Sequence, residues 1–262
     1  MENDEQVAAY SEAGRIDGVM AASYLFNSAH ASAVIQGSRT VVDLGCGPAT
    51  QLAQIAQLNP QIQFHGIDLS PTMLETAERH VRSLGLSNVR FTRGDITALG
   101  FLGNSSIDAV ISTVTLHHLP TLGHLRACFR EVKRILRAGG ALYLVDFGRL
   151  KQLKSVLFFA YMNAKAQPHV FSLDYERSLR AAFLFDEFKQ LCDEELPADA
   201  RVAATFLSPM LTVIHTEPKP LDEQLRERLK VMRRALPRRY RADLDDLRLF
   251  LRLGGLRGDP FR

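Results

Sequence analysis

Apolar residues gather in five short runs between residues 40 and 147, and segments of helical periodicity separate these runs. The runs contain many Val and Ile residues and show little polar alternation, as strands do when both of their faces are buried. Helices are predicted near residues 49–58, 71–84 and 121–137, with Gly139-Gly140 ending the third. Alternating strands and helices predict βαβ units and a parallel sheet. The predicted strands are Thr40–Leu44, Ile62–Ile67, Val89–Thr92, Ile107–Ser112 and Ala141–Phe147.

The chain before and after this pattern is mostly helical. Residues 4–36 predict one or two helices, and residues 150–195 predict a helix with a bulky apolar patch at 156–162 and a second helix near 175–192. After these helices come two β-like runs, at residues 201–207 and 210–216. Only Ser208-Pro209 separates the two runs, which fits an antiparallel hairpin.

The last segment returns to helix, with an apolar residue at every third or fourth position from Leu221 to Leu236. We therefore expect an N-terminal helical lid over residues 1–37, a core over 38–218 with a helical insert at about 150–180, and a basic helical C-terminal extension over 219–262.

Composition narrows the class of protein. The longest bulky apolar stretch, residues 156–162, is far too short to cross a membrane. The first ten residues are acidic and polar, unlike a secretory leader, so we expect a cytoplasmic protein. The three cysteines, at positions 46, 128 and 192, have no metal-binding or disulfide spacing, and no metal is expected.

The excess of basic over acidic residues lies in the C-terminal segment of the sequence. Residues 219–262 hold 13 Lys and Arg against 7 Asp and Glu, while the whole chain has a net charge of only +3. A basic tail of this kind fits either a nucleic-acid arm or a solvated helical face.

A glycine turn and two acids follow successive predicted strands. Gly45, Cys46 and Gly47 come directly after the first strand, and glycine lets the backbone approach a ligand closely. Asp68 lies 21 residues beyond Gly47, the interval that puts a carboxylate at the end of the second strand, where it can bind ribose hydroxyls. Asp95 ends the next strand. The alternative is that these carboxylates, and Asp43 within the first strand, only cap helices.

The turn favours a nucleoside without phosphates. Thr50 stands where a dinucleotide-binding turn has its third glycine, and Pro48 has no N–H to offer a phosphate.

Five segments together resemble a known family. "VVDLGCGPA", "HGIDLSPTML", "VRFTRGDIT", "IDAVISTVTLHHL" and "LRAGGALYLVDF" are similar to the successive motifs of class I S-adenosylmethionine-dependent methyltransferases, most of all the small-molecule type of quinone and natural-product pathways. The resemblance covers roughly residues 38–148. It implies a Rossmann-like α/β fold: a seven-stranded, mostly parallel sheet with an antiparallel last strand, and helices on both faces.

The same resemblance implies a role for each motif residue. Gly45, Cys46 and Gly47 would pass the methionine part of S-adenosylmethionine, with Asp43 helping through water or an amide. Asp68 would bind the ribose diol, and Leu69 would pack on one face of the adenine. Asp95 would bind the adenine amino group, and Ile96 would cover the other face of the adenine. Ser112 and Thr113 would line the cofactor and face its methyl group.

The acceptor side offers weaker candidates. His117 and His118 follow the fourth strand, and an imidazole is a natural base for a phenol, enol or ring nitrogen. The alternative is that one or both histidines only pack in the loop beneath the next helix, and a scaffold role is favoured for at least one of them. The insert and the leading helices supply further candidates, each of which can also be simple packing. The candidate acceptor-binding residues are Tyr10, Tyr24, Phe158, Tyr161, Met162 and His169.

Three functions stay open on sequence alone. The first is methylation of a small, aromatic or lipophilic metabolite, with S-adenosylhomocysteine as the second product. The second is methylation of RNA or protein held by the basic tail, although the segment after the fourth strand has no motif of the nucleic-acid enzymes. The third is a non-catalytic adaptor that keeps the cofactor pocket. The apolar stripes of the tail favour packing across a second subunit or over the acceptor pocket, and hence a homodimer.

Overall fold

Seven strands form one sheet in the order β3-β2-β1-β4-β5-β7-β6 in the computed structural model, which describes residues 18–165 and 167–262. The strands β1 to β5 run parallel, and β7 runs antiparallel to both β5 and β6. This confirms the predicted sheet with its reversed last strand. The bounds are β1 (Thr40–Leu44), β2 (Gln63–Asp68), β3 (Val89–Arg93), β4 (Ile107–Thr113), β5 (Leu136–Phe147), β6 (Arg201–Ala204) and β7 (Leu211–His215).

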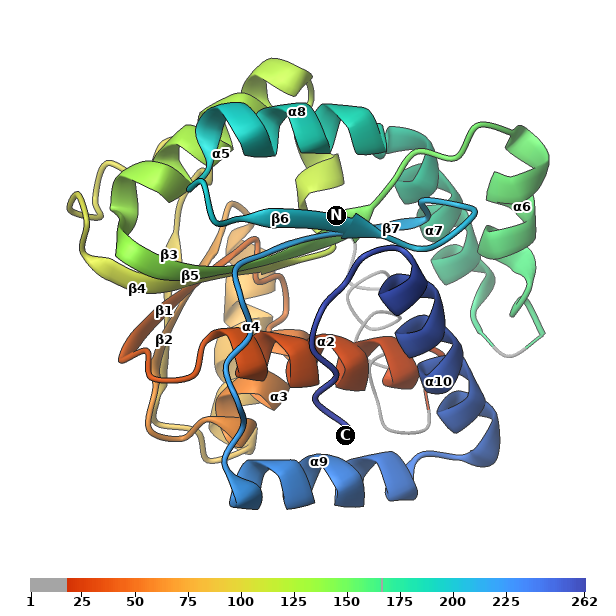
Figure 1. Cartoon of the computed structure of the whole chain (residues 1–262), viewed down its shortest axis with the longest axis horizontal. Helices are drawn as coiled ribbons and strands as arrows, with labels where there is room; N and C mark the ends of the chain where they lie inside the picture. Colours follow the sequence, from red (N-terminus) through yellow and green to blue (C-terminus); the bar gives the residue numbers. More distant parts are fainter. Residues whose placement is uncertain (1–17, 166) are drawn as a thin grey trace.

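Helices cover both faces of this sheet (Figure 1). α5 and α8 pack on one face against Val42, Val110 and Leu142, while α2, α3, α9 and α10 share the other face with Val41 and Tyr143. Because successive strand residues point to opposite faces, an unbroken apolar run is needed to bury both layers. The helices described are α2 (Ala21–Val34), α3 (Thr50–Leu58), α4 (Pro71–Ser83), the short η1 (Leu116–His118), α5 (Leu122–Ile135), α6 (Leu153–Tyr161), α7 (His169–Ala181), α8 (Phe185–Glu195), α9 (Glu223–Ala235) and α10 (Arg238–Leu253).

Helix α4 begins where its sequence predicts. The Ser70 hydroxyl accepts a hydrogen bond from the backbone N–H of Met73, and Pro71 occupies the first turn, where its missing N–H costs nothing. This cap leaves two residues between the end of β2 and the start of α4.

Three predicted boundaries are wrong. Gly139-Gly140 lies inside β5 and does not end a helix, because α5 ends at Ile135 and the positive φ of Gly139 (70°) accompanies a register shift against β4. The predicted helix near 175–192 is two helices, since residues 182–184 are extended and Phe183 bridges to Gly148. The hairpin loop is also longer than Ser208-Pro209, because β6 ends at Ala204 and β7 starts at Leu211.

Helix α2 is part of the fold's helical layer. Leu25, Phe26 and Ala29 are buried beneath the sheet, and the Tyr143 hydroxyl of β5 donates a hydrogen bond to Asn27 Oδ1 over 2.9 Å. The described part of the predicted helical lid over residues 1–37 thus packs as core, and the division into domains stays a prediction. Tyr10 lies outside the described residues.

The C-terminal extension packs on its own chain. Leu225, Leu229, Leu244 and Leu251 of α9 and α10 join α2 in the main core, and the Arg239 guanidinium of α10 hydrogen-bonds Asn163 beside the insert. The apolar stripes thus need no second subunit to bury them, and the homodimer stays a prediction without their support. No helix in the described part of the chain is long and apolar enough to cross a membrane.

Candidate functional site

The glycine turn lies at the carboxyl end of β1. Gly45 and Gly47 have φ angles of 68° and 53°, in the left-handed region that glycine reaches without strain. The N–H groups of Gly45 and Cys46 both donate to the Ile67 carbonyl of β2, at 2.7 and 3.1 Å. A side chain at position 45 would meet the Thr115 Cγ2 at 2.0 Å, so the turn tolerates only glycine there.

Asp68 ties this turn to the end of β2. Its Oδ2 accepts from the Gly47 N–H at 2.8 Å, and its Oδ1 accepts from the Ser70 N–H at 2.9 Å. The carboxylate is half-buried, and each oxygen keeps a second lone pair for a ligand hydroxyl. The next residue, Leu69, exposes 64% of its surface, so an apolar side chain stands free beside this carboxylate.

Asp43 is buried directly behind the turn. Its Oδ1 has no hydrogen-bond partner among the described residues. Burial, with a further contribution from Asp68, raises its pKa well above the ordinary range. A buried polar atom left unpaired is costly, and such atoms gather at sites that a ligand or water completes.

The thiol of Cys46 packs inward. Its Sγ lies where a side chain at Gly66 would be, and burial raises the pKa of the thiol well above its usual value. The side chain of Cys46 therefore points into the protein, and only its backbone can face a ligand at the turn.

The remaining predicted cofactor residues divide into exposed and buried. Asp95 is exposed, and its Oδ1 accepts from the N–H and hydroxyl of Thr97, while Ile96 is buried in the core under α5. Ser112 is fully buried and its hydroxyl donates to the Leu44 carbonyl at 2.8 Å; Thr113 is half-buried at the strand end. Their roles toward a cofactor stay predictions, and the side chain of Ser112 is already used to join β4 to β1.

His117 is held by a carboxylate. Asp146 near the end of β5 accepts from the His117 backbone N–H at 2.9 Å and from its ring Nδ1 at 2.7 Å, and both side chains are almost fully buried. When Nδ1–H donates to the carboxylate, the lone pair of a neutral ring lies on Nε2. Nε2 is buried and has no partner among the described residues.

His118 stands beside it in a different setting. Its side chain reaches the surface, and its ring centroid lies 4.1 Å from that of His117. Partial desolvation of the ring by surrounding protein atoms, followed by the effect of the neighbouring His117, lowers the pKa of His118 to about 4. At neutral pH this imidazole is therefore uncharged and able to accept a proton.

Those predicted acceptor residues that the structure describes lie in different surroundings. Phe158 and Met162 of the insert are exposed at 62% and 57%. The Tyr161 hydroxyl donates to Glu176 at 2.9 Å, and His169 is exposed near the Tyr161 ring. Tyr24, on α2, is half-buried, and burial raises its pKa to about 12.

The family described as "Methyltransferase domain" matches residues 35–181, more than half of the chain. The chain belongs to the methyltransferase domain family. The matched segment runs from the residue after α2 through β1, the glycine turn, Asp68, Asp95 and the histidine pair to the end of α7. The predictions of the family, of its dependence on S-adenosylmethionine and of its Rossmann-like fold are confirmed.

Several curated relatives of this methyltransferase domain carry names of small-molecule or carrier-bound substrates. The chain is 41% identical over 102 residues to trans-aconitate 2-methyltransferase of Deinococcus radiodurans, covering 39% of this chain and 35% of the relative. It is 27% identical over 188 residues to the malonyl-[acyl-carrier protein] O-methyltransferase of Legionella pneumophila, covering 70% and 56%. These alignments thus span about a third to just over half of each relative's length.

Solved structures share the fold at low identity. The plantazolicin methyltransferase BpumL, crystallised with a desmethylPZN analog and SAH, aligns with a TM-score of 0.59 at 12% identity, over 84% of this chain and 91% of that one. The YcgJ protein of Bacillus subtilis aligns with a TM-score of 0.52 at 17% identity, over 85% and 82%. At such identities the likeness concerns the fold.

The residues of this methyltransferase domain fit an adenosyl cofactor. The unpaired Oδ1 of Asp43, the free lone pairs of Asp68 and the bare backbone of the glycine turn provide polar groups, and Leu69 provides an exposed apolar surface. Such a set suits a ligand with hydroxyl and amino groups on a flat ring system.

Two residues that lie at the carboxyl ends of the parallel strands were not predicted from the sequence. The Thr115 hydroxyl donates to the Gly45 carbonyl at 2.8 Å and so braces the turn against the chain after β4. Asp146 orients His117. The only signal for Asp146 is an acid within the apolar run "ALYLVDF", and Thr115 has no signal that separates it from neighbouring polar residues.

Proposed function

We propose that this chain transfers a methyl group from S-adenosylmethionine to an O, N or C nucleophile of a small, aromatic or lipophilic metabolite, with S-adenosylhomocysteine as second product. The observation that carries the proposal is the arrangement at the carboxyl ends of β1 and β2. There Asp68 holds the Gly47 N–H and Asp43 keeps an unpaired buried oxygen. Ligands of open parallel sheets bind at this edge.

The bound cofactor supplies a sulfonium methyl that is already activated. The protein's own task is then to place the nucleophile in line and to keep water out. Asp68 would hold the ribose hydroxyls, Leu69 would cover the adenine, and Asp95 would accept from its amino group. Gly45, fixed by Thr115, would keep the backbone close to the methionine part.

The two histidines support separate tasks. His117 is buried and bound at two points to Asp146, which suits a positioning residue. His118 reaches the surface and stays neutral at pH 7, which suits the group that contacts the acceptor and takes its proton. An acceptor such as a phenol or enol needs such a base, whereas an amine that is already deprotonated does not.

A small molecule is a better acceptor than RNA for this chain. Two arginines of the basic extension are paired with its own acids: Arg233 binds Asp245, and Arg248 binds both Asp245 and Asp259. A nucleic-acid arm would keep such guanidinium groups free for phosphates. Two relatives are named for methylation of trans-aconitate and of a malonyl group on an acyl-carrier protein, and these names also support an acceptor other than RNA.

The test is a methyl-transfer screen with the full chain. Purified protein is incubated with S-adenosylmethionine carrying a trideuterated methyl group and with fractionated metabolite extract, and products are followed by mass spectrometry. We expect one or a few small molecules to gain the labelled methyl, with stoichiometric S-adenosylhomocysteine. Label found only in RNA or protein would overturn the choice of acceptor, and no transfer to any fraction would overturn the activity.

A further inference from the structure

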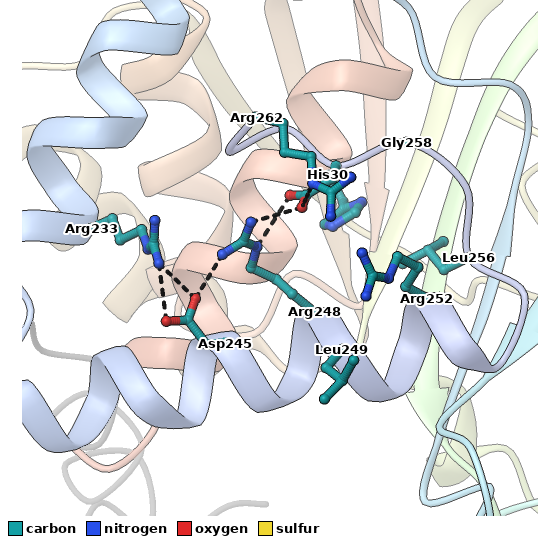
Figure 2. A pocket seen from close by; sticks show the side chains of 10 residues that line it. His30, Arg233, Asp245, Arg248, Leu249, Arg252, Leu256, Gly258 and Arg262 are labelled. Atoms are coloured by element: carbon teal, nitrogen blue, oxygen red, sulfur yellow. Dashed lines mark hydrogen bonds and ion pairs between the residues drawn. The ribbon is translucent and has the colours of Figure 1, made fainter.

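A cavity of about 580 Å³ lies away from the glycine turn, where the C-terminal extension meets α2. His30 of α2 lines one wall, Arg248 and Arg252 of α10 line another, and Gly258 and Arg262 of the last segment close a third. Figure 2 shows the guanidinium groups of Arg248 and Arg252 projecting from α10 on the side that His30 and Arg262 occupy. Polar and charged side chains from three separate segments therefore converge on one space.

The charges around the cavity do not cancel. Asp245 accepts from Arg233 at 2.8 Å and from Arg248 at 2.6 Å, and Asp259 accepts from Arg248 at 2.7 Å and faces Arg262 at 3.3 Å. Three guanidinium groups thus share two carboxylates. Arg252, the fourth, forms no hydrogen bond or ion pair with any residue that the structure describes. The lining keeps an excess of two positive charges.

A buried histidine faces the same space. His30 exposes only 5% of its surface, its ring centroid lies 4.3 Å from that of Phe26, and its ring nitrogens form no hydrogen bond with any residue that the structure describes. Burial lowers its pKa to about 3, so its ring is neutral and offers one N–H donor and one acceptor. A buried polar group without a partner normally has a ligand or water to bind.

We propose that this cavity binds a small oxyanion with two negative charges, a phosphomonoester or a dicarboxylate. Two charges match the excess of two, the guanidinium groups offer the forked donors that phosphate and carboxylate oxygens accept, and the His30 N–H supplies a donor at the buried end. The ligand would join α10 and the last segment to α2, and would therefore stabilise the extension on the core. This site is independent of the methyl-transfer proposal.

Thermal unfolding of the full chain tests the proposal. Inorganic phosphate and succinate serve as dianion probes, with sodium chloride and acetate at matched ionic strength. A dianion at about 100 times its Kd should raise Tm by about 5–10 °C in a saturable manner. A response to phosphate alone identifies the phosphomonoester class, and one to succinate alone identifies the dicarboxylate class.

Two arginine variants with the same charge change separate specific binding from general salt effects. Arg252→Gln should remove most of the dianion-induced shift, while Arg241→Gln, exposed on the same helix outside the cavity, should keep it. S-adenosylhomocysteine affinity should be unchanged in both variants. No saturable shift, a shift equal to that of chloride, or an equal shift in Arg252→Gln would each overturn the site.

Discussion

At the scale of single residues, His117 and His118 are neighbours in sequence with opposite surroundings. His117 is buried on Asp146, and His118 reaches the surface at the strand edge. We expect His118→Ala to lower turnover about 10²–10⁴-fold with little change in cofactor affinity. His117→Ala should in addition lower the free energy of unfolding by about 1–3 kcal/mol, because the buried Asp146 carboxyl loses its one side-chain partner among the described residues and keeps only backbone donors.

The measurement is steady-state turnover with the acceptor found by the methyl-transfer screen, beside chemical unfolding of each variant. Full turnover in His118→Ala would show that this imidazole takes no proton. Loss of stability in His118→Ala equal to that in His117→Ala would show that the two histidines act as one structural unit.

His30 makes stability depend on pH. Burial lowers its pKa to about 3, with Asp259 opposing the shift and His215 and Arg248 adding to it. The folded state keeps this ring neutral, while the unfolded state binds a proton below about pH 6.5, so the stabilisation is present above 6.5 and is lost as pH falls toward 3. Between pH 7 and pH 5 the wild type should lose about 2 kcal/mol more than His30→Gln.

Urea unfolding at both pH values, in buffers without phosphate or carboxylates, measures this difference. Parallel curves for the two proteins would show that the His30 ring reaches solvent and titrates normally.

Individual side chains differ in how far sequence predicts them. Asp68 is predictable because its distance from the glycine turn corresponds to one βαβ unit, and parallel strands end at a common edge. Thr115 is not, because its bond to Gly45 joins positions 70 residues apart, and the partner is known only once β1 and β4 are adjacent.

At the scale of elements, α10 carries the attachment of the extension. Leu244 is fully buried against α2, whereas Leu253 on the same helix is 53% exposed. We expect Leu244→Ala to reduce the free energy of unfolding by about 2–5 kcal/mol, through lost burial and the cavity left behind. Leu253→Ala, with the same change in side chain, should stay within about 0.5 kcal/mol.

Denaturant unfolding of the two variants checks this. Equal and small effects would mean that α10 does not pack on the core in solution.

Element types were easier to predict than their ends. The Val- and Ile-rich runs give the first five strands because a doubly covered sheet needs unbroken apolar residues. The break between α7 and α8 has neither Gly nor Pro; it is set by the bridge of Phe183 to Gly148 and by burial of Phe183 beside Phe188. Contacts of this kind are tertiary, and local sequence does not encode them.

At the scale of the whole molecule, the apolar stripes of α9 and α10 correctly indicate burial but do not identify their partner. An amphipathic helix specifies that one face is covered, and the topology then decides what covers it. Here α2, which precedes the sheet in sequence, takes up α9 and α10, which follow it. Helix α2 and the C-terminal helices α9 and α10 thus share one layer of the molecule (Figure 1).

The central claim is that the edge of β1 and β2 binds an adenosyl cofactor through Asp68. Isothermal titration of S-adenosylhomocysteine into the full chain tests it most directly, with Asp68→Ala beside Asp186→Ala, an exposed acid outside this site. Two charge-assisted hydrogen bonds of about 1.5–3 kcal/mol each are lost with Asp68, so affinity should fall at least about 100-fold, and Asp95→Ala should cost less.

Circular dichroism must show that Asp68→Ala stays folded, since its carboxylate also holds the Gly47 N–H. The account predicts one S-adenosylhomocysteine per chain for wild type and for Asp186→Ala, and an affinity at least about 100-fold lower for a folded Asp68→Ala. Equal affinity in all three proteins, or no binding to the wild type, would contradict it.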